Sequence, residues 1–252
     1  METEQQSAAL RALSLLEVLA QAEGPVSLTE MIAATGLPKA TTHRLLVLLE
    51  GAGMVVREPA AKRYAPGTRL ATLALTVLTN SAWRAPRHAI LQSLVAEIGE
   101  TCNLTLLDGA EVVYLDRVEA AWPLRLHFQV GSRVPAHASA SGKLLLALLP
   151  ARSRQRLVNA MPLTRYTPNT LADARALEAA LVETRKLRLG TDHEEYLTGT
   201  VCVAVPVEDK TRRIPAALAV HAPVTRMSLK QALAHVPALR RAAGKLAQTF
   251  GE

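Results

Sequence analysis

A run of side chains after Pro38 has the chemistry needed to recognise the edges of base pairs. Lys39 and Arg44 can donate hydrogen bonds to the acceptors of guanine, and the threonine hydroxyls between them read bases more permissively. In helix-turn-helix proteins the first residues of the second helix make such contacts. The candidate base-reading residues are Lys39, Thr41, Thr42, His43 and Arg44.

A second group of basic and polar side chains is suited to bind phosphates or to enter a minor groove. Such contacts position a protein on DNA without specifying sequence. A short exposed helix often carries lysine, threonine and arginine without binding DNA, so the run after Pro38 alone does not establish this function. The further candidate DNA contacts are Arg11, Arg57, Lys62, Arg63 and Tyr64.

The charge supports this interpretation only locally. The 252-residue chain has a net charge of +7, but residues 1–80 hold seven basic and seven acidic side chains, so the whole excess lies in residues 81–252. Residues 31–70 carry six basic side chains against two acidic ones. The local basic cluster, more than the global charge, therefore indicates a nucleic-acid partner.

Three helices are predicted before and through this run. Leucines recur at every third position between Ala8 and Ala22, which is typical of one helix face. Ser27 and Glu30 have the spacing of a capping box, which predicts a short helix to about Thr35 that Gly36 ends.

The third helix begins near Pro38 and a hairpin follows it. We expect Leu45, Leu48 and Leu49 to pack inward from this helix. Two short strands over residues 54–57 and 63–65 then predict a β-hairpin. Three helices and a hairpin form a winged helix-turn-helix, which we assign to residues 1–66.

The remaining chain predicts a linker helix over residues 67–81 and an α+β domain over residues 82–252. Apolar periodicity and turn residues favour helices beside a mostly antiparallel sheet. The expected helices lie near residues 88–98, 139–149, 152–160, 171–187 and 228–250, and the expected strands near residues 102–107, 111–118, 124–129, 200–207 and 214–221.

Several segments resemble those of IclR-type bacterial regulators, in the same order. GLPKATTHRLLVLLEGAGMV and REPAAKRYAPGTRL are similar to the family's winged helix-turn-helix. GETCNLTLLDGAEVVYLDRVEA, VGSRVPAHASASGKLLLALLP, DHEEYLTGTVCVAVPV and IPAALAVHAP are similar to its effector-binding domain. Ala40 and Pro66 depart from the family's usual serine and leucine.

The resemblance implies a GAF-like C-terminal domain that binds a small molecule between its sheet and the loops above. A helix beginning at Ser139 would offer free N–H groups to an anion, so we expect a small organic acid, aliphatic or aromatic. Taken singly, Ser139 is equally well explained as a helix cap and Cys202 as a packing residue. The positions that match the family's pocket are Leu126, Val134, Ala140, Ser141, Asp192, Thr200, Cys202, Ala219 and His221.

Enzyme motifs are not complete in this sequence. The segment before Lys143 has His137 where a P-loop needs glycine, and Leu144 stands where it needs serine or threonine. No two histidines have zinc-ligand spacing with an acidic partner, so we expect no metal, cofactor or catalytic residue. Glu194 and Glu195 are expected in a solvated loop, near an arginine. The alternative is an enzyme whose winged domain binds protein.

Expectations for location and partners follow from further features. The N-terminus lacks the pattern of a secretory signal, and Cys102 and Cys202 form no CxxC pair, so we expect a cytoplasmic protein. No apolar run is long enough to cross a membrane. The expected partners are double-stranded operator DNA, a small-molecule effector and further copies of the chain, as a homodimer or homotetramer that represses or activates transcription.

Overall fold

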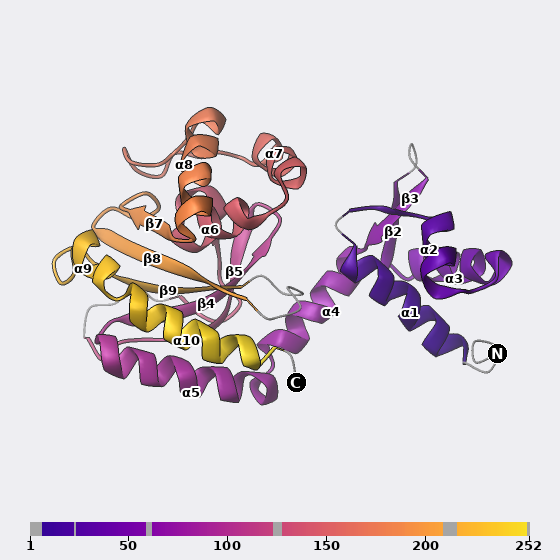
Figure 1. The fold of residues 1–252 in the computed structure, drawn as a ribbon, viewed down its shortest axis with the longest axis horizontal. Coiled ribbons are helices and arrows are strands. Elements are labelled where there is room, and N and C mark those ends of the chain that lie inside the picture. The colour runs from indigo at the N-terminus through magenta and orange to yellow at the C-terminus, as the bar shows by residue number, and fades with distance from the viewer. Residues whose placement is uncertain (1–6, 23, 59–61, 123–127, 209–215, 251–252) are drawn as a thin grey trace. The chain divides into compact units, whose positions relative to one another are not determined.

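The computed structural model describes residues 7–22, 24–58, 62–122, 128–208 and 216–250, with the side chains of residues 81–83 left out (Figure 1). Their contacts divide the chain into two compact units, residues 1–78 and 79–252, which we describe separately. The helix predicted over residues 67–81 is present as α4, Thr68–Thr79.

The N-terminal unit is a winged helix-turn-helix with a small antiparallel sheet. Its strands lie in the order β1, β3, β2, and Val26 of β1 pairs with Tyr64 of β3. The hairpin is confirmed, whereas the two-residue strand β1 was not predicted because it is too short to show a pattern. Before α4, the elements are α1 (Ala8–Gln21), β1 (Val26–Ser27), α2 (Leu28–Thr35), α3 (Lys39–Gly51), β2 (Val55–Glu58) and β3 (Arg63–Pro66).

Local signals fix the turn between α2 and α3. The hydroxyl of Ser27 accepts from the N–H of Glu30 at 3.2 Å, and the carboxylate of Glu30 accepts from the N–H of Ser27 at 2.6 Å. Gly36 adopts the left-handed conformation with φ +67°, which only glycine adopts at little cost. The predicted capping box and helix end are therefore confirmed.

The buried face of α3 differs from the prediction. Leu45 is buried as expected, but Leu48 is 64% exposed and Leu49 is only partly buried. Thr42 and Leu46 complete the buried face instead. The spacing of Thr42, Leu45 and Leu46 follows one stripe of the helix, so the small threonine occupies a core position for which only leucines were expected.

The C-terminal unit is built on a six-stranded antiparallel sheet in the order β6, β5, β4, β9, β8, β7. The expected α+β architecture with an antiparallel sheet is confirmed. The elements are α5 (Ser81–Ile98), β4 (Thr101–Asp108), β5 (Glu111–Val118), β6 (Arg133–Pro135), the 3₁₀ turn η1 (Ala136–Ala138), α6 (Ala140–Leu148), α7 (Ala151–Ala160), α8 (Ala174–Leu187), β7 (Gly190–His193), β8 (Thr200–Val207), β9 (Ala216–Pro223), α9 (Leu229–Ala234) and α10 (Val236–Gln248).

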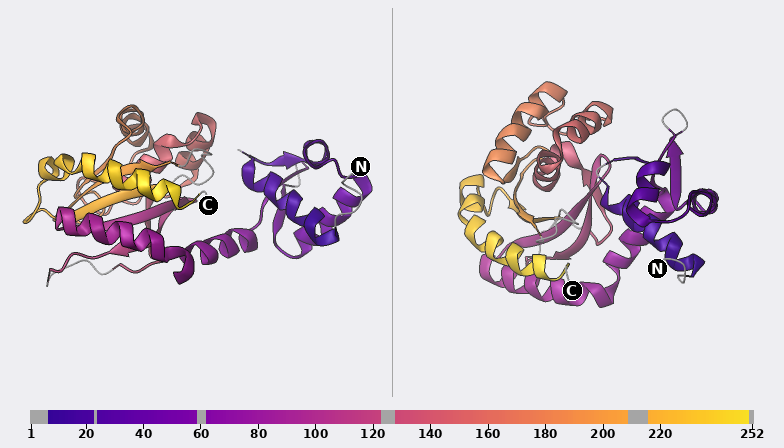
Figure 2. Two further views of the ribbon diagram at one scale, coloured as in Figure 1. Left: turned by 60° about the horizontal axis from the view of Figure 1, so that its bottom comes forward. Right: turned by 45° about the vertical axis from the view of Figure 1, so that its right-hand side comes forward.

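Helices cover the two faces of this sheet. α5 and α10 run side by side over one face, and α6 with α8 lies over the other (Figures 1 and 2). Asp116 of β5 is fully buried and fastens α5 to the sheet, because its carboxylate bonds to Nδ1 of His88 at 3.0 Å and pairs with Arg84 at 3.4 Å. The layer between α6 and the sheet contains the candidate effector site.

One predicted helix differs from the structure, two short strands were not predicted, and one predicted strand is not tested. The helix expected over residues 228–250 is divided into α9 and α10, since Pro237 lies in the first turn of α10 and has no N–H to continue α9. Strands β6 and β7 were not predicted, as each is only three or four residues long. Most of the strand expected near residues 124–129 lies outside the described residues.

Candidate functional site

The exposed side of α3 carries the predicted base-reading side chains. Lys39, His43 and Arg44 are exposed, and Thr41 is partly exposed. All four come from the first two turns of α3, which begins directly after Pro38. This arrangement leaves one cationic helix face open to a ligand as large as DNA.

Two predicted DNA contacts face the core instead. Thr42 is fully buried, and its hydroxyl donates to the carbonyl of Pro38 at 3.1 Å, so it stabilises the start of α3. Tyr64 is 3% exposed and packs in the core of the N-terminal unit. Thr42 and Tyr64 are both next to residues that are more exposed than they are. The residue types alone did not show which side chains face the core and which face the solvent.

The other predicted basic contacts of this unit differ in exposure and in hydrogen bonding. Arg57 and Lys62 are exposed, and the guanidinium of Arg57 lies 5.8 Å from the centre of the Tyr64 ring. Arg63 is held by the fold, because it donates to the carbonyl of Pro25 at 2.7 Å and pairs with Glu30 at 3.3 Å. Arg11 is partly buried in α1.

A cavity of about 50 Å³ lies between α6, the sheet and the turn after β7. It brings together seven of the nine positions named above as the candidate pocket. Ala219 belongs to the apolar cluster at this place but is not part of the cavity wall, and Leu126 lies outside the described residues. The seven are Val134, Ala140, Ser141, Asp192, Thr200, Cys202 and His221.

The start of α6 forms one wall of the cavity. Ser139 caps this helix, since its hydroxyl accepts from the N–H of Gly142 at 3.2 Å. Ala140 and Ser141 follow the cap, where backbone N–H groups have no partner inside a helix. Such N–H groups, together with the positive end of the helix dipole, favour an anion.

Asp192 on β7 supplies a carboxyl group to the same end of the cavity. It is 6% exposed, and its Oδ1 accepts from the N–H of Glu195 at 2.7 Å. Burial raises the pKa of Asp192 to about 7, and the charge of Glu195 adds to this rise. At neutral pH the group can therefore donate a hydrogen bond as an acid as well as accept one.

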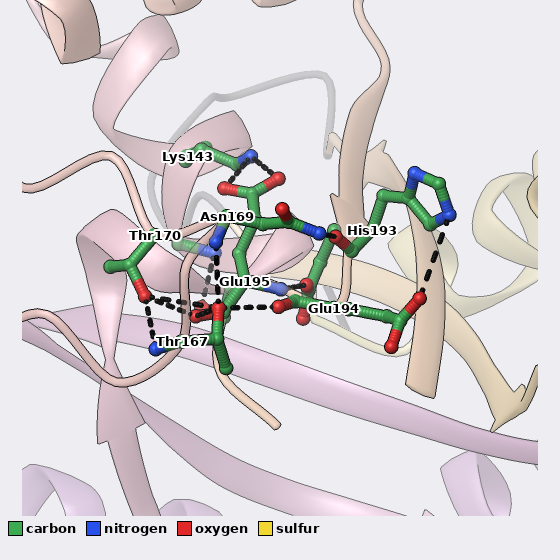
Figure 3. Close-up of polar contacts among 10 residues, drawn as sticks. Lys143, Thr167, Asn169, Thr170, His193, Glu194 and Glu195 are labelled. Carbon is green, nitrogen blue, oxygen red and sulfur yellow. Dashed lines mark hydrogen bonds and ion pairs between the residues drawn. The ribbon is translucent and has the colours of Figure 1, made fainter. Parts of the chain in front are cut away.

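A buried ion pair holds the turn after β7 against α6 (Figure 3). Both carboxylate oxygens of Glu195 contact the ammonium of Lys143, and both side chains are almost fully buried. The hydroxyl of Thr170 also donates to the carbonyl of Glu195 at 2.6 Å. The expectation of a solvated loop with an arginine partner was wrong for Glu195, because its partner is a lysine on a helix 52 positions earlier.

The neighbouring Glu194 also serves the turn. Its carboxylate accepts from the N–H of Gly199 at 2.7 Å, and its backbone has φ +59°. Glu194 thus closes the loop between β7 and β8. Tyr196 and Leu197 of this loop line the cavity.

Cys202 and His221 extend the cavity across the sheet. They are direct partners on β8 and β9, and Cys202 also pairs with Asp192 on β7. Burial raises the pKa of the Cys202 thiol well above its usual value, so it is an uncharged packing group. Burial and the nearby positive charges of Arg117 and Arg226 lower the pKa of His221 to about 3.

Several wall residues were not predicted from the sequence. Asn103 and Thr105 lie two positions apart on β4 and both line the cavity. This spacing places two side chains on the same face of a strand, so it could have indicated them. The rings of Tyr114 and Phe128 stack with centres 5.6 Å apart and fill part of the space beside the cavity. Tyr196 had no local signal because it lies in a loop.

Neither a metal cluster nor a membrane-spanning helix is found among the described residues. Within the ranges given above, no group of three or more histidine, cysteine, aspartate or glutamate side chains could hold a metal ion. No helix in the same part of the chain has the length and apolarity needed to span a bilayer.

Both units match known proteins. The family model for the C-terminal region of bacterial IclR transcriptional regulators matches residues 75–248, and the IclR helix-turn-helix model matches residues 8–59. The chain is 50% identical over 252 residues, the whole of both chains, to a protein of Cupriavidus necator named "Probable transcriptional regulator SauR".

Solved structures agree with this match. IclR of Thermotoga maritima has a TM-score of 0.64 at 28% identity, with 97% of this chain and 98% of that chain covered. A double mutant of the PobR inducer-binding domain from Acinetobacter, in complex with 3-hydroxybenzoic acid, has a TM-score of 0.58 at 29% identity and covers 64% of this chain and 94% of that chain.

A helix-turn-helix unit joined to an effector-binding unit defines a ligand-responsive regulator of transcription. The chain belongs to the IclR family of DNA-binding transcriptional regulators. The members that it matches are regulators, so the expectation that the chain is not an enzyme is confirmed and the alternative of an enzyme with an accessory winged domain is set aside.

Proposed function

We propose that this regulator binds operator DNA through the start of α3 and that a short aliphatic organic acid in the cavity of the C-terminal unit modulates this binding. The observation that carries the proposal is that the N-terminus of α6 and the buried carboxyl group of Asp192 line the same small cavity. We call Ser139, Ala140, Ser141 and Asp192 the acid end.

The acid end has complementary groups for a carboxylate. The N–H groups of Ala140 and Ser141 can donate to one oxygen, and the protonated carboxyl group of Asp192 can donate to the other. The Acinetobacter relative was solved with a hydroxybenzoic acid, which supports an acid as the ligand class.

The size of the cavity favours an aliphatic acid over an aromatic one. A water molecule needs about 10–15 Å³ of such space, so a volume of about 50 Å³ corresponds to roughly four water-sized groups. A carboxylate with a chain of two or three carbons fits this volume. The stacked rings of Tyr114 and Phe128 line the cavity and limit its size.

The regulator acts as a homodimer or a larger assembly in this proposal. α4 has no buried residue, and its Leu73 and Val77 are 52% and 43% exposed. Exposed apolar side chains on one helix favour a partner surface. A second copy of the chain supplies that surface with twofold symmetry, which matches the two half-sites of an operator.

The test measures DNA binding with and without an acid. The full-length protein is titrated onto DNA from upstream of its own gene, by fluorescence anisotropy at several salt concentrations, with and without millimolar propionate. We expect salt-dependent binding that propionate shifts, in either direction, by at least threefold. Lys39→Ala with Arg44→Ala should weaken binding, and should lower the salt slope by about one for each of the two side chains that contacts a phosphate.

Matched controls separate these effects from general loss of charge. Arg152→Ala with Lys245→Ala removes two exposed cations from the C-terminal unit and should leave the affinity for DNA unchanged. Wild-type affinity in the Lys39 and Arg44 variant would contradict the assigned DNA face. A DNA affinity that is insensitive to propionate and to other short acids would contradict the acid effector.

A further inference from the structure

His221 in the cavity wall has a polar atom without a hydrogen-bond partner among the described residues. Its Nδ1 is buried and has no hydrogen-bond partner among the described residues, and His221 lines the cavity from β9. A buried polar atom that stays unpaired costs on the order of 1–3 kcal/mol. A ligand group that bonds to Nδ1 would remove this cost.

Polar and charged groups surround this histidine. Asn103 of β4 lines the cavity, and its Oδ1 accepts from Nη1 of Arg117 at 2.7 Å. Arg117 is 7% exposed, and its Nε pairs with the carboxylate of Glu119 at 3.3 Å. We call Asn103, Arg117 and His221 the histidine end of the cavity.

The strand register fixes the separation of the two ends. Asp192 pairs with Cys202, and Cys202 pairs with His221, so Asp192 and His221 lie in one row, two strands apart. Two strand spacings amount to about 10 Å between backbones. Side chains of directly paired residues lie on the same face of a sheet, so Asp192, Cys202 and His221 face the same layer.

A short acid with a polar group at each end and a CH₂ group between them suits this row of residues. Between the two ends lies the uncharged thiol of Cys202, which suits a CH₂ group. The polar pattern of the cavity thus has two ends and an apolar middle.

We propose that the effector carries a second hydrogen-bond acceptor, preferably a second carboxylate, and that His221 binds this group while the first carboxylate lies at the acid end. The inference rests on the proposed function, since it needs an acid in the cavity. As its Nδ1–H tautomer, His221 donates a hydrogen bond to the second group. A plain alkanoic acid leaves Nδ1 unpaired.

The experiment compares three acids with the same carbon number. Isothermal titration calorimetry on the full-length protein measures the Kd of malonate, 3-hydroxypropionate and propionate, which differ only at the far end. We expect malonate to bind at least tenfold more tightly than propionate, with 3-hydroxypropionate between them. His221→Leu should reduce the ratio between propionate and malonate to below threefold, whereas His221→Gln, which keeps a donor, should retain part of the preference.

A histidine outside the cavity provides the control. His193 is exposed on β7, so His193→Leu should keep the wild-type preference for malonate. Equal affinities for malonate and propionate in the wild-type protein would overturn the inference and leave the acid effector intact. A preference that persists in His221→Leu would overturn it as well. Failure of all three acids to bind would remove the proposed function together with this inference.

Discussion

Single buried groups determine the chemistry of the effector cavity. The carboxyl group of Asp192 is the clearest case, because burial raises its pKa to about 7, near the pH of a cell. In its protonated form this carboxyl group can donate a hydrogen bond to a carboxylate beside it. Lys143 and Glu195, by contrast, form an ion pair in which their charges compensate one another.

The titration of Asp192 predicts a pH dependence of stability. Because the folded-state pKa lies above the unfolded value near 3.8, the protonated folded form is favoured, and this contribution is lost as pH rises from about 4 through 7. An asparagine does not ionise, so Asp192→Asn removes this loss of stability with rising pH. We expect the variant to gain thermal stability relative to wild type between pH 5 and pH 8.

Thermal denaturation of both proteins across this pH range measures the effect. The difference in Tm, variant minus wild type, should increase with pH and level off above about pH 8. A difference that stays constant from pH 5 to pH 8 would show that Asp192 ionises at its ordinary pKa.

At the scale of elements, the cavity depends on how closely α6 approaches β7. A Cβ atom at Gly190 would lie 2.1 Å from the carbonyl oxygen of Ala140, so strand and helix meet at a distance that only glycine permits. A Cβ at Gly142 would likewise lie 2.3 Å from the carbonyl oxygen of Ala136. Two glycines thus set the position of the helix start that forms the acid end.

Gly190→Ala should therefore displace α6 and weaken the acid end. We expect a loss of about 1–3 kcal/mol in the free energy of unfolding, as for other overpacked sites, and at least a tenfold loss in affinity for a short acid. Urea denaturation and calorimetry measure the two effects.

A glycine in open space is the matched control. Gly244 lies in α10, and a Cβ added there would have no other atom within 4 Å, so Gly244→Ala should stabilise the protein by about 0.5–1 kcal/mol and leave acid binding unchanged. If Gly190→Ala and Gly244→Ala had the same unfolding free energy and the same affinity for acid, the close approach of α6 and β7 would not be needed for the site.

Elements with local signals could be predicted from the sequence, and contacts between distant elements could not. Ser27, Glu30 and Gly36 define the ends of α2 within ten residues, and both ends were predicted. The ion pair of Lys143 with Glu195 joins segments 52 positions apart, which no local pattern reveals.

The candidate pocket shows the same limit. Its positions followed from resemblance to a family, whereas Asn103 and the stacked rings of Tyr114 and Phe128 enter the wall through the strand register and a loop. The buried side of α3 was also misjudged, since Thr42 pairs with backbone carbonyls and so is satisfied inside the core.

On the scale of the whole molecule, two units must communicate through the chain that joins them. α4 follows the hairpin and leads into α5, whose His88 and Arg84 bind Asp116 on β5. The next residue, Arg117, contacts the cavity residue Asn103. An effector that binds one state of the cavity more tightly than another can shift the population through these elements.

The apolar face of α4 predicts the assembly state. Leu73→Gln with Val77→Gln should reduce the sedimentation mass at micromolar concentration and weaken DNA binding, because each removes apolar area from the proposed contact between copies. Val182→Gln with Leu187→Gln changes two side chains of α8 that are 57% and 56% exposed, and should alter neither property. An unchanged mass in the α4 variant would contradict this surface.

The exposure of α4 has a consequence for how much of this regulator a cell must make. If a second copy covers Leu73 and Val77, dilution separates the copies. At low expression the concentration of dimers able to bind both half-sites of an operator then varies with the square of the amount of chain. The occupancy of the promoter would then depend on the expression level of the regulator as well as on the effector. A modest change in synthesis would move promoter occupancy more steeply than a simple one-to-one binding curve allows.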